Sequence, residues 1–422
     1  MIGFKYIHII IPLMKLNVGV IDVDILHQKS RFPNLAVMKI SAFSKSLGHT
    51  TTLIYNDDTD YSAFDIIICS KVFDFSDEPP NLKQFLDSYS LDRSKLHLDV
   101  YSILRTRYKP LIPLVAVGGT GYFEVNCLFL HKKIEHIMPD YHIYDEYVQS
   151  ELARGIKYNE LKDYMECSIG FTSRGCFRRC GFCVNRRFKR CSKHSPVSEF
   201  LDDSRPRITM LDDNILACRY WKSILEELIR INKPFKFKQG IDVRLITPAI
   251  AKMLAKCKYD GDVTFAFDHY NQKDQIVSKL KVWRKYCPKK STKLYILTAF
   301  EPYGHNIVRT PEEQAKRDLR DIRETLERVF IINEFRCKPY IMKYKAYNQS
   351  KYRGVYVLLA RWCNQPTFFY KMSLEEFAKT QQKSIKTDKL GAPMRALELL
   401  KADAPDLYEE FAHRIGSLKF EE

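Results

Sequence analysis

Residues 168–183 read SIGFTSRGCFRRCGFC, a short strand pattern that runs directly into three closely spaced cysteines. The cysteines are Cys176, Cys180 and Cys183, in the spacing C-x3-C-x2-C. Loops at the carboxyl ends of strands bind ligands in α/β proteins, and neighbouring thiols there can bind zinc or an iron–sulfur cluster. The stretch therefore predicts a metal site built on an α/β fold.

Strand and helix patterns alternate from residue 165 to residue 345. The strand candidates are SIGFTS, RITML, FKFKQ, DVTFAF, TKLYILT and KPYIMKY. Helical patterns lie between them, around 221–229 and 276–283 and after Pro248 and Pro311. Thr247 precedes the first of these prolines, and Thr310 begins a capping box before the second. Six βα units in succession predict an open, parallel, barrel-like sheet with its ligands at the carboxyl ends of the strands.

The last of these helices carries an apolar stripe of Leu319, Ile322, Leu326 and Val329, which we expect in the core. Before the six units, apolar runs at 17–26, 51–55, 64–70 and 111–123, with a helical pattern at 35–48, predict a small Rossmann-like domain. After residue 345 the alternation stops, and 373–384 and 392–402 have helical patterns. We expect domains at 1–150, 151–345 and 346–422.

Composition restricts the partners and the compartment. The formal charge of +17 favours an acidic partner, although lysine-rich usage alone also explains much of it. Most of the twelve cysteines stand singly in apolar segments, as Cys69 does, which is not the pattern of a secreted disulfide framework. The opening MIGFKYIHIIIPLMK is short, contains His8 and Pro12, and lacks a cleavage site. We therefore expect a cytoplasmic protein with no membrane span.

The three cysteines allow more than one metal. A structural zinc site needs a fourth ligand, which Cys191 or His194 can supply. A redox C-x2-C pair would leave Cys176 without a role. Three close thiols on a cluster leave one iron open to a substrate, which a closed zinc site does not.

This arrangement resembles the radical S-adenosylmethionine (SAM) superfamily. The resemblance rests on the cysteine spacing, the lead-in GFTSRGC, the Rossmann-like domain before it and the six βα units after it, and it covers residues 17–345. It implies a partial (β/α)6 barrel in which Cys176, Cys180 and Cys183 hold a 4Fe–4S cluster. It also implies that SAM chelates the fourth iron, with Phe182 near the adenine.

Residues after the later strands acquire roles by the same resemblance. Asp213, with its neighbours Asp212 and Asn214, is expected to receive the amino group of SAM. The alternative for the two aspartates is capping of the helix around Trp221. After the third strand, Arg244 is the candidate for the SAM carboxylate.

Weaker candidates follow on the same strand ends. Gln239 and Asp242 are candidate substrate contacts. Asp268 and His269 follow the fourth strand, and Thr298 ends the fifth, so these three are further candidates for the site. Capping of the next helix is an equal alternative for Asp268. The sequence assigns no catalytic residue.

The N-terminal domain departs from the cobalamin-binding domains that it resembles. Those domains commonly carry D-x-H-x-x-G, whereas here Asp24 is followed by ILHQKS, with His27 one position late and no matching glycine. Gly118-Gly119-Thr120-Gly121 does match a late glycine turn of such domains. The departure argues against cobalamin binding and favours a structural or substrate-binding domain.

Seven basic residues surround the cysteines: Arg174, Arg178, Arg179, Arg186, Arg187, Lys189 and Arg190. They are a solvated loop, a docking surface for an acidic electron donor such as flavodoxin or ferredoxin, or a phosphate-binding surface where Phe177 or Phe188 stacks on a base. The C-terminal region also interleaves basic and aromatic residues, a pattern that suits a nucleic-acid substrate but is also typical of tyrosines that pack a domain edge. These residues are Lys343, Tyr344, Lys345, Tyr347, Lys351, Tyr352, Arg353, Arg361 and Trp362.

The resulting hypothesis is a radical SAM enzyme that cleaves SAM to a 5′-deoxyadenosyl radical and modifies a nucleic-acid base or nucleotide. Two alternatives remain open at this point. One is a cobalamin-dependent radical SAM methyltransferase, and the other is a non-catalytic, zinc-bearing nucleic-acid-binding protein.

Overall fold

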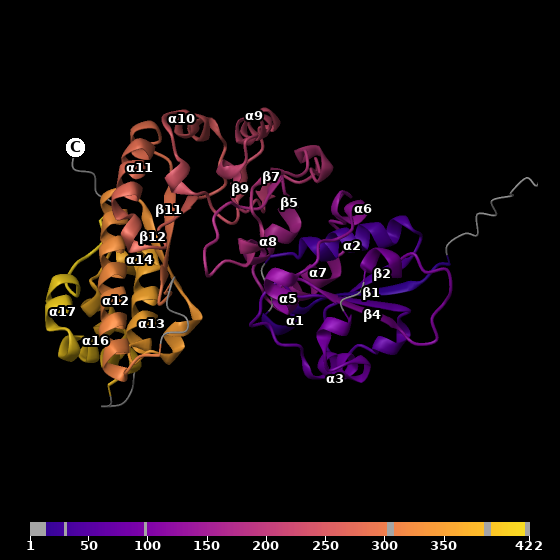
Figure 1. Ribbon diagram of the computed structural model, residues 1–422, viewed down its shortest axis with the longest axis horizontal. Coiled ribbons are helices and arrows are strands. Elements are labelled where there is room, and N and C mark those ends of the chain that lie inside the picture. The colour runs from indigo at the N-terminus through magenta and orange to yellow at the C-terminus, as the bar shows by residue number, and fades with distance from the viewer. Residues whose placement is uncertain (1–13, 29–31, 97–98, 302–307, 384–389, 418–422) are drawn as a thin grey trace, which may run out of the picture. The chain divides into compact units, whose positions relative to one another are not determined.

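The computed structural model describes residues 14–28, 32–96, 99–301, 308–383 and 390–417, which form a mixed α/β fold with parallel sheets (Figure 1). The N-terminal stretch that contains His8 and Pro12 lies outside the described residues. The chain divides into two compact units. Unit 1 comprises residues up to 172, 184–187 and 194–210, and unit 2 comprises 173–183, 188–193 and residues from 211 onward.

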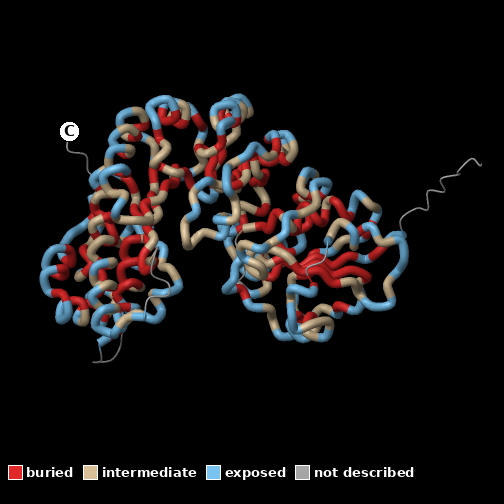
Figure 2. Tube along the Cα trace, in the orientation of Figure 1, coloured by how far each residue is buried: buried red, intermediate tan, exposed pale blue. Residues whose placement is uncertain are grey.

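Unit 1 is built on a four-stranded parallel sheet in the order β2-β1-β3-β4. The strands are β1 (Asn17–Asp22), β2 (Thr50–Ile54), β3 (Ile66–Ser70) and β4 (Leu114–Gly118). Figure 2 shows this sheet buried, and β3 is buried along its whole length. Burial on both faces explains why β1, β3 and β4 are mainly continuous apolar runs, whereas the edge strand β2 begins with three threonines that are exposed or partly exposed.

Helices cover both faces of this sheet. One core contains Val18, Val20, Ile66 and Ile68 with residues of α2 (Leu35–Ser46), α7 (Asp145–Ala153) and α8 (Tyr158–Glu166). The other contains Ile21, Ile67 and Cys69 with residues of α3 (Pro80–Tyr89). Figure 1 accordingly shows α2 and α3 on opposite faces. Shorter helices complete the connections: α1 (Val23–Gln28), α4 (Val100–Ile103), α5 (Thr120–Phe123) and α6 (Lys132–Glu135).

Unit 1 also contains the first two strands of the predicted six. These are β5 (Cys167–Gly170) and β8 (Arg207–Met210), which pair in parallel. Arg205 holds this region to the rest of the unit, because its guanidinium donates to the backbone oxygens of Tyr141, Tyr164 and Cys167. Unit 1 therefore extends past the predicted boundary at residue 150.

Unit 2 contains the other four predicted strands: β9 (Phe235–Phe237), β10 (Val263–Ala266), β11 (Thr292–Thr298) and β12 (Lys338–Lys343). The last three form a parallel sheet in chain order. Between them lie α9 (Trp221–Ile231), α10 (Pro248–Lys256), α11 (Lys273–Tyr286) and α12 (Pro311–Glu334). A two-stranded antiparallel pair, β6 (Ser173–Arg174) with β7 (Ser192–Lys193), brackets the cysteine loop.

The local signals for helix starts are confirmed. Thr247 caps α10 by accepting a hydrogen bond from the Ile250 amide, and Thr310 with Glu313 makes the capping box of α12. In the α12 stripe Ile322, Leu326 and Val329 are fully buried and Leu319 is partly buried, so the stripe lies in the core as predicted.

The C-terminal region is helical, as predicted, and belongs to the same unit as β9–β12. It contains α13 (Arg353–Cys363), α14 (Pro366–Phe369), α15 (Leu374–Lys383), α16 (Ala392–Asp403) and α17 (Pro405–Phe411). The side-chain amide of Asn364 pairs with both the N–H and the C=O of Ile341, so it satisfies the edge of β12. In the described segments, no helix is long and apolar enough to cross a membrane.

Candidate functional site

The cysteine loop is tied to the turn that follows β8. The Asp212 carboxylate is buried and accepts hydrogen bonds from both the amide and the hydroxyl of Ser173, each at 2.6 Å. Asp213 accepts from the Gly175 amide at 2.6 Å. Gly175 has φ +92°, and a Cβ there would lie 2.4 Å from the Arg190 carbonyl oxygen, so this position requires glycine. The two aspartates thus fix the entry to the loop.

These contacts test whether Asp212 and Asp213 cap the helix α9, but they do not test whether the turn binds SAM. The helix α9 has Tyr220 as its N-cap residue and no side-chain capping bond, so the capping alternative for Asp212 and Asp213 is wrong. Asp212 is buried, whereas Asp213 is partly exposed. The expected role of the turn in binding the amino group of SAM stays a prediction, with Asp213 as the accessible carboxylate.

All three cysteines of the motif are partly exposed thiols on the loop. The Cys176 sulfur accepts hydrogen bonds from the Arg178 amide and from the side-chain amide of Asn214, both at 3.3 Å. The Cys183 amide donates to the Cys180 carbonyl at 3.0 Å. Burial raises the pKa of Cys180, and the negative charges of Asp268, Cys176 and Asp242 add to this while Arg244 opposes it.

The donor chemistry of the loop fits an iron–sulfur cluster. Thiolates are the usual ligands of such clusters, and N–H groups that donate to the sulfurs tune the cluster potential, as the two donors at Cys176 would. Across the described ranges, however, no three His, Cys, Asp or Glu side chains lie close enough together to hold a metal ion.

The two residues considered as a fourth zinc ligand are engaged elsewhere. The Cys191 thiol donates to the Asn214 carbonyl at 3.5 Å, and burial raises its pKa to about 12, so it stays protonated at neutral pH. His194 lies in unit 1, where its Nε2 faces Glu135 at 3.2 Å and its Nδ1 faces the Ser195 hydroxyl at 2.9 Å.

An ion-pair network stands after β9. The Asp242 carboxylate takes hydrogen bonds from Arg244 at 2.6 and 3.1 Å and from Arg178 at 2.9 Å. Burial alone would raise the pKa of Asp242, but the hydrogen bonds and charges of the two arginines outweigh it and lower the pKa. Two guanidinium groups on one carboxylate give this network net positive charge, which the nearby Asp268 carboxyl partly offsets. The guanidinium groups suit an anionic group such as the SAM carboxylate. Gln239, the other candidate on this strand end, is exposed.

Aromatic rings surround the predicted adenine contact. The Phe182 ring lies 5.2 Å from Phe300, edge to face, and 6.1 Å from the His269 ring. Phe300 also lies 4.9 Å from Tyr344. Burial lowers the pKa of His269, and the charges of Arg328 and Arg244 lower it further, so the imidazole is neutral at neutral pH. A flat, uncharged ring would have aromatic packing partners here.

The ends of β10 and β11 are held by α12. Arg328 is buried and donates to the carbonyls of Phe267, Asp268 and Leu297 at 2.9–3.0 Å. Burial raises the pKa of the Asp268 carboxyl to about 6, against the lowering charges of Arg328 and Arg244. No side-chain cap bond is present at α11, whose N-cap residue is Gln272, so Asp268 does not cap that helix.

Thr298 and the residue after it are fixed by Asp321 of α12. The Asp321 carboxylate accepts from the Thr298 hydroxyl at 2.7 Å and from the Ala299 amide at 2.8 Å. Ala299 has φ +58°, a strained conformation for a residue with a Cβ, and Asp321 helps to hold it. Sequence reasoning missed Phe300, Asp321 and Arg328, because α12 reaches these strand ends only in three dimensions.

The basic residues around the cysteines divide into two groups. Arg178 is committed to Asp242, and the Arg187 guanidinium donates to the Cys127 carbonyl and covers the Phe129 ring. Exposed basic side chains include Arg179, Lys189 and Arg190. Phe177 is also exposed, beneath the Arg178 guanidinium.

Some of the basic and aromatic residues of the C-terminal region make contacts within unit 2, whereas Lys345, Arg353 and Arg361 are exposed. Tyr352 and Trp362 are buried, and Trp362 donates to the Met372 carbonyl. Lys351 pairs with Asp403, which also accepts from the Tyr352 hydroxyl. Tyr352 and Trp362 therefore follow the packing alternative, and the nucleic-acid role of the pattern stays a prediction.

The glycine turn of unit 1 is filled by the chain itself. Gly119 has φ +104°, and a Cβ there would lie 2.1 Å from the Lys71 carbonyl oxygen. The Thr120 hydroxyl donates to the Val72 carbonyl, and the Asp24 carboxylate accepts from the Val72 amide. His27 is exposed in the last turn of α1. The loops that follow β3 and β4 thus pack on one another, and the expectation against cobalamin binding stays a prediction.

A buried polar cluster lies where the chain order of the unit 1 sheet reverses, between β1 and β3. The Asp22 carboxylate accepts from the Tyr144 hydroxyl at 2.7 Å and from the Asp24 amide at 3.3 Å. The Asn34 amide donates to the Tyr144 oxygen, and its side chain donates to Ser70. Burial raises the pKa of Asp22 to about 7, and the charge of Asp24 contributes.

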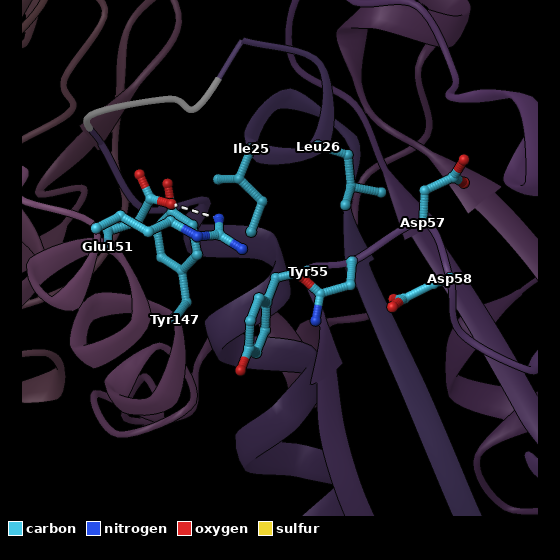
Figure 3. Close-up of a pocket in the computed structure, with 9 residues that line it drawn as sticks. Ile25, Leu26, Tyr55, Asp57, Asp58, Tyr147 and Glu151 are labelled. Carbon is cyan, nitrogen blue, oxygen red and sulfur yellow. Dashed lines mark hydrogen bonds and ion pairs between the residues drawn. The ribbon is translucent and has the colours of Figure 1, made fainter.

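Unit 1 also contains a cavity of about 340 Å³ beside β2, shown in Figure 3. Its lining includes Tyr55, Asp57, Asp58, Tyr147, Glu151 and Arg154. Glu151 is buried and pairs with Arg154 at 2.9 Å, the dashed contact in Figure 3. Asp57 accepts from the first amides of α3, those of Asn81 and Leu82. The charged groups of this cavity are thus mostly committed to the fold.

A scan against protein-family models found no match to the chain, and a search of curated proteins found none either.

Proposed function

We propose that the chain is a radical SAM enzyme with an N-terminal Rossmann-like domain and a partial (β/α)6 barrel. The observation that carries the proposal is the C-x3-C-x2-C loop between β6 and β7, whose entry is fixed by Asp212 and Asp213. Cys176, Cys180 and Cys183 would hold a 4Fe–4S cluster, with Asn214 donating to the Cys176 sulfur. When bound, the cluster supplies the electron that cleaves SAM to methionine and a 5′-deoxyadenosyl radical.

The surrounding residues would bind and orient SAM. Asp213 would accept hydrogen bonds from its ammonium group, and the Arg178–Asp242–Arg244 network would face its carboxylate with net positive charge. Phe182 would contact the adenine, supported by Phe300. Phe300 is buried and Phe182 is partly buried, so these side chains would exclude water from a ring that packs on them. Exclusion of water protects a reactive radical from side reactions.

The substrate class that suits this site is a nucleic-acid base or nucleotide. The exposed Arg179, Lys189 and Arg190 beside the loop would attract either a phosphate backbone or an acidic electron donor of the flavodoxin or ferredoxin type. No role for cobalamin is included, because Asp24 and His27 depart from the motif of cobalamin-binding domains.

Anaerobic reconstitution with iron and sulfide tests the proposal. The wild-type chain is expected to take up iron and sulfide, turn brown, and release 5′-deoxyadenosine from SAM under dithionite. Cys180→Ser should lose both properties. Cys191→Ser is the matched control, because Cys191 lies on the same segment but donates to Asn214 instead.

The same experiment separates this proposal from a zinc protein. A four-ligand zinc site completed by Cys191 would lose its metal in both variants. Stoichiometric zinc without iron uptake, together with metal loss in Cys191→Ser, would overturn the iron–sulfur proposal.

A further inference from the structure

Two arginines hold the opposite ends of the unit 2 sheet. Arg328 of α12 donates to three backbone oxygens at the carboxyl ends of β10 and β11. Arg284 of α11 donates to four backbone oxygens that precede β11 and β12, those of Cys287, Lys290, Phe335 and Arg336. Ligands of parallel sheets bind at the carboxyl ends of the strands, so only Arg328 lies at the end where a ligand is expected.

Arg328 begins a buried chain of hydrogen bonds. Its guanidinium donates to the Thr325 hydroxyl at 3.1 Å, and the hydroxyls of Thr325 and Thr298 lie 2.9 Å apart. The Thr298 hydroxyl gives its proton to the Asp321 carboxylate at 2.7 Å, so Thr325 is the donor to Thr298. Both threonines are fully buried, and Arg328 is 2% exposed. The chain thus runs from a cation to a carboxylate, and the loss of one member leaves a buried neighbour without its hydrogen bond.

The residues that follow the two held strand ends belong to an aromatic cluster. His269 comes directly after the end of β10 that α12 holds. Phe300 comes directly after Ala299, whose amide donates to Asp321 at 2.8 Å. With Phe182 of the cysteine loop these two rings form what we call the aromatic triangle, whose ring centres lie 5.2, 6.0 and 6.1 Å apart. Two of its three corners therefore follow backbone that α12 holds in place.

The direction of Phe300 depends on this hold. Ala299 has φ +58°, which is strained for a residue with a Cβ, so the turn that carries Phe300 out of β11 needs support from outside the strand. Asp321 supplies that support through the Ala299 amide. Phe300 is buried, whereas Phe182 and His269 are partly exposed, so the triangle presents ring surface beside the strand ends. A shift of the strand ends would therefore move the surface on which a flat ligand would pack.

We propose that Arg328 is a positioning residue of the proposed SAM site. Through its hydrogen-bond chain it fixes two corners of the aromatic triangle, His269 and Phe300, against the third. The alternative is that Arg328 only satisfies buried carbonyl groups, as Arg284 does at the other end of the sheet. The inference rests on the proposed function for the identity of the ligand. The position of the rings can be measured without cluster or SAM, so the inference and the proposed function can fail separately.

The ring signals of His269 in nuclear magnetic resonance test the positioning directly. In the full-length chain with ¹³C-labelled histidine, the ring currents of Phe182 and Phe300 should shift these signals, and His269→Gln identifies them among the eleven histidines. Arg328→Met should displace them toward the positions of a histidine without aromatic neighbours. Arg284→Met is the matched control and should leave them in place, although it also removes a guanidinium from several backbone oxygens.

Two threonines of β11 repeat the comparison with smaller changes. Thr298→Val keeps the shape of the side chain but removes the central hydroxyl of the hydrogen-bond chain at the carboxyl end. Thr292→Val removes a buried hydroxyl at the amino end, where it accepts from the Trp283 indole at 3.0 Å. Only Thr298→Val should displace the His269 signals. This pair decides between the two roles even where Arg328→Met fails to fold.

SAM affinity after anaerobic reconstitution gives the functional readout. Arg328→Met and Thr298→Val should take up iron as the wild type does and bind SAM about tenfold more weakly, which is the effect of losing one base–aromatic stack. Arg284→Met and Thr292→Val should keep the wild-type affinity. Because all four variants lose hydrogen bonds in unit 2, a general loss of stability would not separate the two pairs.

The inference is wrong under any of three results. They are unchanged His269 signals in both Arg328→Met and Thr298→Val, equal displacement by the variants at the two ends of the sheet, and displaced signals with wild-type SAM affinity. Absence of iron uptake and of SAM binding by the wild-type chain would instead refute the proposed function. The His269 signals would then still decide whether Arg328 positions the rings.

Discussion

Asp22 makes the stability of unit 1 depend on pH in a defined direction. Its carboxyl is buried at the end of β1, and its pKa is raised from 3.8 to about 7. A carboxyl with a raised pKa in the folded state stabilises the fold fully below its unfolded value, and this contribution is lost as pH rises to the folded value. The difference corresponds to about 4 kcal/mol, at about 1.4 kcal/mol for each pH unit between 3.8 and 7.

The substitution Asp22→Asn should remove this dependence. An amide is neutral at every pH, so the unfolding free energy of the variant relative to the wild type should increase by about 4 kcal/mol between pH 4 and pH 7 and stay constant above. Tyr144→Phe is the second variant. The Tyr144 hydroxyl donates to Asp22 and lowers the pKa of that carboxyl. Its loss should therefore raise the pKa of Asp22 in the folded state and extend the pH range over which stability is lost to higher pH.

The tryptophans provide an internal control for the assay. Trp221, Trp283 and Trp362 are the three tryptophans of the chain, and all belong to unit 2. Urea unfolding of unit 1 should therefore be followed by amide hydrogen exchange in β1 and β3, with tryptophan fluorescence reporting unit 2. A constant difference between Asp22→Asn and the wild type from pH 4 to pH 8 would refute the reasoning, as would an equal change in both units.

Three further predictions concern unit 2. Arg328→Met should lower its unfolding free energy by about 3 kcal/mol or more, measured by tryptophan fluorescence in urea, because three strand-end carbonyls lose a buried donor. Thr310→Ala should cost about 1 kcal/mol through loss of the α12 cap in the same assay, whereas Thr310→Ser should be nearly neutral. Gly175→Ala should abolish iron uptake, since its Cβ would lie 2.4 Å from the Arg190 carbonyl; Gly261→Ala, which has a similar positive φ but open space, should retain it.

The alternation of strands and helices was predictable because its signals are local. All six strands from β5 to β12 that carry helices between them appear at the predicted positions, since each is a short apolar run bounded by a helix start or a polar turn. In the N-terminal sheet, the run at 17–26 departs from the prediction, because it forms β1 only as far as Asp22 and then the helix α1 from Val23. A continuous apolar run does not distinguish a buried strand from the helix that follows it.

The contacts that shape the site were not predictable, because they join residues far apart in sequence. Arg328 and Asp321 belong to α12 and look like ordinary surface charges of an amphipathic helix, yet they hold the ends of β10 and β11. Trp362 shows the reverse case, since its basic neighbours suited a nucleic-acid surface whereas its ring is buried. Composition around a residue does not reveal which way its side chain points.

The two aspartates of the turn after β8, which the sequence treated as one candidate site for SAM, differ in their contacts. Asp212 is buried, and a single oxygen of its carboxylate accepts both Ser173 hydrogen bonds, so removing it would release the loop whatever ligand is present. Asp213 is partly exposed and holds Gly175 through one oxygen.

If this turn binds the ammonium of SAM, Asp213→Asn should weaken SAM binding by the loss of a charge-assisted hydrogen bond while iron uptake persists. Asp212→Ala should instead reduce iron uptake, because it removes the acceptor of both Ser173 hydrogen bonds. Equal effects of the two variants on iron and on SAM would mean that both aspartates serve the loop alone.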